Sequence, residues 1–243
     1  TERDDTRITG GPGVGENLVL VGTGKAEVIT LAADTGKILW RGSVSSEVLS
    51  APQPAGKTIV VRTIDGKIFG LDSQDGKRLW TYEQSVPALT LRGTSSPVIA
   101  GNFLIAGFDE GRLAAIELQT GKVAWDTRIV IGSGRTELER MTDIDAEPVI
   151  MGDVIYVATF QGRVAALALE TGRILWSREV SSYAGLCADE KAIYVTDDDS
   201  AIWALDRTTG NSLWKQEKLT ARALTAPAIS GNMLVAGDME GYV

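Results

Sequence analysis

The 243-residue chain contains no histidine and only one cysteine, Cys187. A single cysteine cannot form an intrachain disulfide, and without histidine the Cys/His zinc sites are excluded as well. The same two absences remove the Ser–His and Cys–His pairs that nucleophilic catalysis uses. Because Cys187 lies in the apolar stretch Gly-Leu-Cys-Ala, we expect it to be a small buried side chain.

Basic runs and long apolar runs are also missing. The chain has 24 Lys and Arg against 32 Asp and Glu, a formal net charge of −8, so nucleic acid is a poor candidate partner. The longest apolar stretches, such as 154–158, are much shorter than the roughly 18 residues of a membrane helix. The sequence opens on polar residues, so we expect any export signal or lipid anchor to lie outside it.

The strongest feature that is present is an internal repeat. Counted from Pro52 as origin, glycines lie at +4, +14 and +24, a leucine at +19 and a tryptophan at +28. Pro97 and Pro148 start copies with the same offsets, with isoleucine at +19 after Pro97. Pro12 and Leu186 start weaker copies, and the copy from Pro227 is cut off at Val243. The tryptophans in phase are Trp40, Trp80, Trp125, Trp176 and Trp214.

Each copy reads as four short antiparallel strands, A to D, because apolar stretches of strand length alternate with glycine-containing turns. One such copy is a blade of a β-propeller. The predicted fold is therefore all-β, a propeller of four-stranded blades forming one incomplete domain over 1–243. The segment before Pro12 could be a further strand D. The expected blades are 12–44, 52–84, 97–129, 148–180 and 186–218, with a partial blade at 227–243.

The phased tryptophans are expected to be buried between neighbouring blades, because phase with a structural repeat is what packing requires. We therefore interpret them as structural docking residues and not as a ligand cage. Trp203 lies out of phase, on strand C of the fifth copy, and its role is open.

Insertions are confined to one connection, from strand D to the next strand A. From each tryptophan to the next origin the distance is 12, 17, 23, 10 and 13 residues. This connection should share an edge with the B–C turns, and loops on a rigid scaffold commonly carry binding surfaces. The two longest connections belong to neighbouring copies, so we expect their residues to lie close together.

Other constellations are weaker. Asp197, Asp198 and Asp199 lack the spaced oxygen ligands of a calcium loop, so we expect a solvated turn and no metal site. The glycine-rich segment 10–15 has neither the spacing nor the strand-to-helix context of a dinucleotide site.

The segment from Ala204 to Trp214 resembles the docking motif of quinoprotein alcohol dehydrogenase-like propellers. That superfamily includes quinone-dependent dehydrogenases and non-enzymatic scaffolds. The dehydrogenases are expected to carry an adjacent pair of cysteines and a set of calcium ligands, and a single cysteine excludes the pair. The resemblance therefore favours a scaffold that has no catalytic residues and no cofactor.

Within the scaffold branch, four segments are similar to the BamB family in order and spacing: 89–97, 107–112, 139–148 and 160–162. The resemblance implies an eight-bladed propeller lipoprotein, anchored at the periplasmic face of the outer membrane, that serves the outer-membrane β-barrel assembly machinery. It further implies binding to the POTRA region of BamA, with unfolded outer-membrane proteins as possible clients. The family's partner contacts fall on Leu89, Leu91, Arg92, Asp143 and Asp145.

Alternatives remain open at this point. Leu89 and Leu91 could instead pack inward as part of a strand, and Asp143 and Asp145 could cap turns. The chain could also be a fragment of a quinone-dependent dehydrogenase, or a general periplasmic propeller adaptor.

Overall fold

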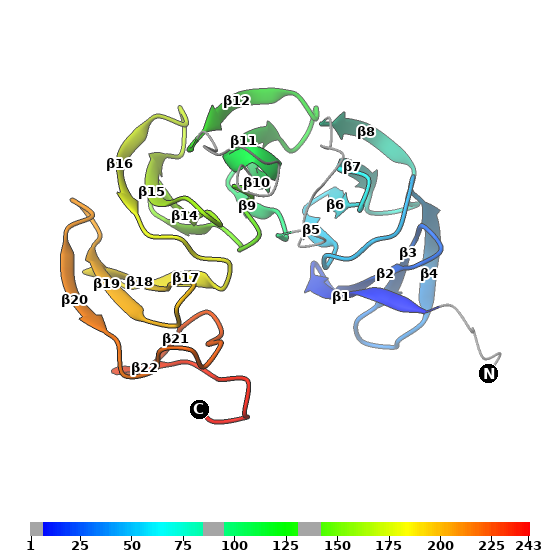
Figure 1. Cartoon of the computed structure of the whole chain (residues 1–243). Helices are drawn as coiled ribbons and strands as arrows, with labels where there is room; N and C mark the ends of the chain where they lie inside the picture. Colours follow the sequence, from blue (N-terminus) through cyan, green and yellow to red (C-terminus); the bar gives the residue numbers. More distant parts are fainter. Residues whose placement is uncertain (1–6, 85–94, 131–141) are drawn as a thin grey trace. The chain divides into compact units, whose positions relative to one another are not determined.

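The computed structural model describes residues 7–84, 95–130 and 142–243. These residues form five four-stranded antiparallel sheets and a sixth sheet of two strands, each with its strands in sequence order (Figure 1). The only helical element in them is the short 3-10 turn η1 (Asp109–Gly111). No helix of the described segments is long and apolar enough to cross a membrane. The expected all-β class is confirmed, with a four-stranded sheet in each of the first five copies.

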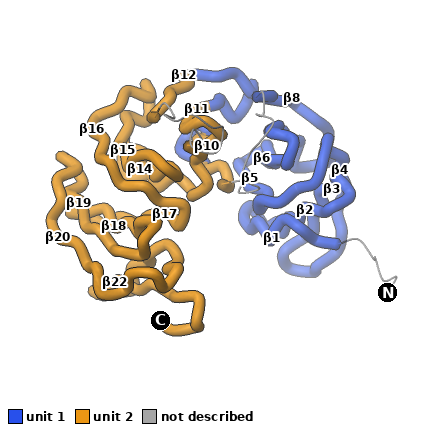
Figure 2. The backbone as a smooth tube through the Cα atoms, viewed as in Figure 1, with its two compact units in different colours: residues 1–88, 99–104, 116–124 blue, residues 89–98, 105–115, 125–243 orange. Residues whose placement is uncertain are grey.

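The chain divides into two compact units, residues 1–88, 99–104 and 116–124, and residues 89–98, 105–115 and 125–243 (Figure 2). The first two sheets lie in the first unit, and the strands of the third sheet are divided between the units. The strands of these three sheets are β1 (Ile8–Gly15), β2 (Leu18–Thr23), β3 (Glu27–Ala32), β4 (Ile38–Ser43), β5 (Gln53–Ala55), β6 (Thr58–Arg62), β7 (Lys67–Asp72), β8 (Arg78–Glu83), β9 (Val98–Ala100), β10 (Phe103–Phe108), β11 (Arg112–Glu117) and β12 (Val123–Arg128).

The second unit holds the three remaining sheets. In each complete sheet the second and third strands are the most buried, because both of their faces are covered. The strands are β13 (Val149–Met151), β14 (Val154–Ala158), β15 (Arg163–Ala168), β16 (Ile174–Glu179), β17 (Gly185–Ala188), β18 (Ala192–Thr196), β19 (Ile202–Asp206), β20 (Ser212–Gln216), β21 (Ala228–Ser230) and β22 (Met233–Val235).

The first strand differs from expectation. The residues before Pro12 do not form a strand D of another copy: they begin β1, which pairs antiparallel with β2 over Ile8 to Gly15. The glycine-rich sequence lets β1 absorb two irregularities in register while staying paired. Glu16 and Asn17 both have positive φ, 52° and 59°, as a two-residue hairpin of type I′ requires.

Neighbouring sheets within a unit pack face to face. In the first unit, Leu20, Val28 and Trp40 of the first sheet form one core cluster with Ile59 and Leu71 of the second. An equivalent cluster joins the fourth and fifth sheets in the second unit. Each sheet therefore buries its apolar faces against its neighbours, which a single four-stranded sheet cannot do alone.

Four of the phased tryptophans donate a hydrogen bond to the next copy. Each indole Nε1 reaches the backbone carbonyl at offset +21 of that copy. The pairs are Trp40 to Ser73 (2.9 Å), Trp80 to Leu118 (2.8 Å), Trp125 to Leu169 (2.8 Å) and Trp176 to Arg207 (3.0 Å).

The glycine at +24 explains how the indole fits. A Cβ built on Gly121 would lie 2.8 Å from the ring of Trp80, and its φ of +70° is one that L side chains rarely adopt. The same close approach occurs between Gly76 and Trp40. The two most regular marks of the repeat are thus two halves of one contact between copies.

Trp214 does not follow this pattern, and the expectation that all five tryptophans are mostly buried is wrong there. Its side chain is 45% exposed, and its ring lies 5.9 Å from that of Tyr194. The carbonyl at +21 of the sixth copy would lie beyond Val243, so the indole has no docking position within this sequence.

Trp203 closes a turn of its own copy. Its Nε1 donates to the Asp197 carboxylate at 2.8 Å, and the Lys215 ammonium lies 4.5 Å from its ring centroid. The out-of-phase tryptophan therefore orders the B–C turn of the fifth copy.

Candidate functional site

The D-to-A connections and the B–C turns are joined by a repeated backbone hydrogen bond. The acceptor is the carbonyl five residues before the origin of a copy, and the donor is the N–H twelve residues after it. This arrangement places connection and turn at the same end of the strands. The pairs are Ile64 to Glu47 (3.0 Å), Phe160 to Asp143 (3.0 Å), Asp198 to Ser181 (3.2 Å) and Met239 to Arg222 (3.2 Å).

In the connection that precedes the fourth copy, Ile144 anchors the chain to the third copy. Its side chain is buried, and its backbone N–H donates to the carbonyl of Phe108 at 3.3 Å. Gly107 provides the room, since a Cβ there would lie 2.4 Å from the Ile144 Cγ2. The residues on either side of Ile144 are therefore held against the end of β10.

Asp143 caps the turn of the third copy. Only 3% of the residue is exposed, and its Oδ1 accepts a hydrogen bond of 3.1 Å from the backbone N–H of Glu110. Glu110 has a φ of 57°, in the left-handed region that costs a glutamate conformational energy. The second oxygen, Oδ2, is buried with no hydrogen-bond partner among the described residues. Such an oxygen carries a desolvation cost, so the site contains a polar group that the described chain does not satisfy.

Of the other four predicted site residues, Asp145 alone lies within the described part of the chain. Asp145 is half-buried in the same connection. Leu89, Leu91 and Arg92 lie outside the described residues. The grouping of all five residues into one surface therefore stays a prediction.

The charged pairs at β11 and β12 were not predicted from the sequence. Arg112 pairs with Asp126 across β11 and β12, and Glu110 at the tip of the turn pairs with Arg128. The side chains of Glu110 and Arg128 are 54% and 39% exposed. A signal was available, because each of the first four copies has a charged residue at +15 that pairs with an opposite charge at +29 or +31. These pairs are Glu27–Arg41, Lys67–Glu83, Arg112–Asp126 and Arg163–Glu179.

The acidic run of the fifth copy is a hydrogen-bonded turn. Asp197 Oδ1 accepts from the backbone N–H groups of Asp199 and Ala201, and Asp198 accepts from the Ser181 hydroxyl. Within the described ranges, no group of three or more acidic, cysteine or histidine side chains is arranged to hold a metal ion.

Cys187 is half-buried on β17. Burial, with a smaller contribution from the negative charge of Asp189, raises the pKa of its thiol to about 11. A thiol with such a pKa is almost entirely protonated near neutral pH, which is the opposite of a catalytic cysteine.

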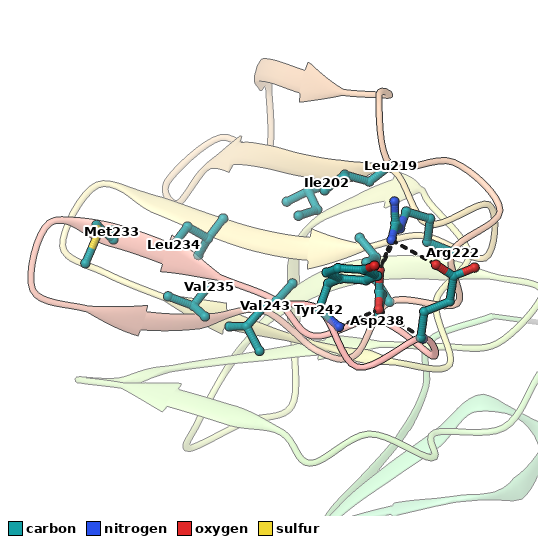
Figure 3. A pocket seen from close by; sticks show the side chains of 12 residues that line it. Ile202, Leu219, Arg222, Met233, Leu234, Val235, Asp238, Tyr242 and Val243 are labelled. Atoms are coloured by element: carbon teal, nitrogen blue, oxygen red, sulfur yellow. Dashed lines mark hydrogen bonds and ion pairs between the residues drawn. The ribbon is translucent and has the colours of Figure 1, made fainter.

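A pocket lies at the sixth copy, where β22 pairs with β21 alone in the described chain (Figure 3). On one side of it Arg222 is paired with Asp238 and Glu240, and Arg222 also lies 5.3 Å from the Tyr242 ring centroid. The complete sheets carry a third strand beside the second, so the pocket reflects a two-stranded sheet and indicates no ligand.

Comparison with known proteins identifies the family. The family model described as "Outer membrane protein assembly factor BamB" matches residues 2–216. A protein of that name from Yersinia pestis is 38% identical over 236 residues, which are 97% of this chain and 60% of the relative. The chain thus spans about 60% of the length of this curated relative.

Solved structures agree. The crystal structure of BamB from Moraxella catarrhalis has a TM-score of 0.89 at 31% identity, over 95% of this chain and 71% of that one, so the expected β-propeller fold is confirmed. A quinohemoprotein alcohol dehydrogenase from Comamonas testosteroni has a TM-score of 0.69 at 17% identity, over 87% and 43%, and shows a shared fold alone. The resemblance seen in the sequence is confirmed, and the chain belongs to the BamB family of outer membrane protein assembly factors.

Proposed function

We propose that this chain is a non-enzymatic scaffold of the outer-membrane β-barrel assembly machinery. It binds the periplasmic POTRA region of BamA and assists the delivery and insertion of outer-membrane proteins. Membership of the BamB family carries the proposal. In the full-length protein we place the scaffold at the periplasmic face of the outer membrane, held there by an N-terminal lipid anchor.

The proposed docking surface consists of the two longest connections, which precede the third and fourth copies. Leu89 and Leu91 provide an apolar centre, and Arg92 and Asp145 provide charges around it. Asp143 belongs to the same connection as Asp145 and is almost fully buried. An apolar centre with flanking charges is typical of binding hot spots. The position of Asp143 and Asp145 supports the proposal, since their connection is fixed to the turns of two copies.

The test is the affinity of the purified periplasmic domains of BamA for the wild-type chain and for three variants, Leu91→Ala, Arg92→Ala and Asp145→Ala. We expect at least one variant to lose about 2 kcal/mol of binding free energy, roughly thirtyfold in Kd, while its melting temperature stays that of the wild type. Lys77→Ala is the control, because Lys77 is exposed on a turn at the opposite end of the strands and should bind normally.

Unchanged affinity in all three variants, with a wild type that binds, would remove the proposed surface. A wild type that does not bind BamA but retains another periplasmic client would support the general adaptor instead.

A further inference from the structure

The same cap occurs twice along the edge that carries the connections. Asp143 and Ser181 each lie five residues before the origin of a copy, and each side chain accepts a hydrogen bond from the turn of the preceding copy. Asp143 accepts from the Glu110 N–H at 3.1 Å, and Ser181 accepts from the Gln161 N–H at 2.7 Å. Both donors lie at offset +13 and have positive φ, 57° and 47°. A carboxylate and a hydroxyl thus perform one task in two copies.

The charge of Asp143 is not needed for this cap, and its side chain presents little surface to a partner. The residue is 3% exposed, and its Oδ2 is buried with no hydrogen-bond partner in the described part of the chain. The turn that Asp143 caps is, by contrast, exposed to solvent at the Glu110 side chain. The Glu110 side chain is 54% exposed and is paired with Arg128 from β12.

We propose that Asp143 is a positioning residue for partner docking, which fixes the turn at Glu110 and thereby presents the Glu110–Arg128 pair to the partner. The inference rests on the proposed docking function. A glutamate remains in the left-handed region only when its surroundings hold it there. Removing the cap frees the Glu110 N–H and lets the turn relax, which moves the exposed pair away from its docking geometry.

The experiment compares Asp143→Ser, Asp143→Asn and Asp143→Ala with the wild type. Serine and asparagine keep an acceptor without the charge, and alanine removes both. Two quantities are measured on each folded chain: the affinity for the periplasmic domains of BamA, and the hydrogen-exchange rate of the Glu110 amide by NMR.

We expect the serine and asparagine variants to bind within about threefold of the wild type and to keep the Glu110 amide protected. The alanine variant should lose about tenfold in affinity, and its Glu110 amide should exchange about tenfold faster, in line with the loss of one hydrogen bond to a charged group. Ser181→Ala is the matched control: it should expose the Gln161 amide and leave BamA affinity within about threefold.

Equal losses of affinity in all three Asp143 variants, with the Glu110 amide still protected in the serine and asparagine variants, would overturn the proposal in favour of direct contact by the charge. Normal binding by Asp143→Ala would overturn it as well. A wild type that does not bind BamA would refute the proposed function, whereas the exchange rates would still show whether Asp143 holds the turn.

Discussion

At the scale of single residues, copies are joined by a tryptophan and a glycine that belong to different copies. The indole of Trp80 crosses to the third copy, donates to the carbonyl of Leu118 and lies over Gly121, which has no side chain to obstruct it. This contact makes one side chain responsible for both an apolar interface and a buried polar bond. It also explains why the glycine at +24 and the tryptophan at +28 keep their offsets in each of the first five copies.

Trp80→Ala should therefore lower the free energy of unfolding by about 3–5 kcal/mol, the usual range for a buried aromatic side chain. Trp214→Ala is the matched control, since that indole is 45% exposed and makes no docking bond in the described chain. We expect it to cost less than about 1 kcal/mol. Urea unfolding of both variants measures the difference, and equal losses would contradict the docking account.

Single residues also show which contacts could not be predicted from the sequence. The repeat predicts which tryptophans share a role, because their offset is constant. It does not predict the cap made by Asp143, because the side chain at that position is glutamate, aspartate, serine or arginine in different copies and acts on the copy before its own. Only the structure brings offset −5 of one copy next to offset +13 of another.

At the scale of elements, the connection before strand A acts as a fixed part of the sheet and not as a free loop. Ile144 bonds to the end of β10 in the third copy, and the Asp143 side chain caps the turn that follows β10. The Asp143 carbonyl accepts from Phe160 in the turn of the fourth copy. The order of strands followed directly from the alternation of apolar stretches and glycine turns. The start of β1 was not predicted, because its glycines pair with β2 in an irregular register. Constant offsets counted from Pro12 do not reveal such irregularities.

Gly107→Ala tests whether this connection is packed as tightly as the structure has it. The new Cβ would lie 2.4 Å from Ile144, so we expect the variant to lose about 1–3 kcal/mol of stability and the Ile144 amide to exchange faster. Gly11→Ala is the control, because nothing lies within 4 Å of a Cβ there and the substitution should be neutral or slightly stabilising. If both variants behaved alike, the packing of Ile144 against β10 would be wrong.

At the scale of the whole molecule, one fold serves two kinds of protein. The chain shares its propeller fold with a quinohemoprotein alcohol dehydrogenase, but its family membership is that of an assembly factor. What separates the two kinds is the chemistry carried by the repeats and not the repeats themselves. The repeat in the sequence was therefore sufficient for the fold, whereas the family required the less regular segments, above all the connections before the third and fourth copies.

We predict that the chain reduces no dye in the presence of an alcohol, a quinone cofactor and Ca²⁺. Its single cysteine cannot supply the adjacent pair expected of the dehydrogenases. Two of the three neighbouring carboxylates already accept hydrogen bonds, Asp197 from backbone N–H groups and Trp203, and Asp198 from the Ser181 hydroxyl. The measurement is the rate of dye reduction, together with the quinone absorbance that stays with the protein after gel filtration. A quinone-dependent dehydrogenase reconstituted in the same way is the positive control. Retained quinone together with alcohol-dependent dye reduction by this chain would contradict the scaffold, because a scaffold neither holds nor uses a redox cofactor.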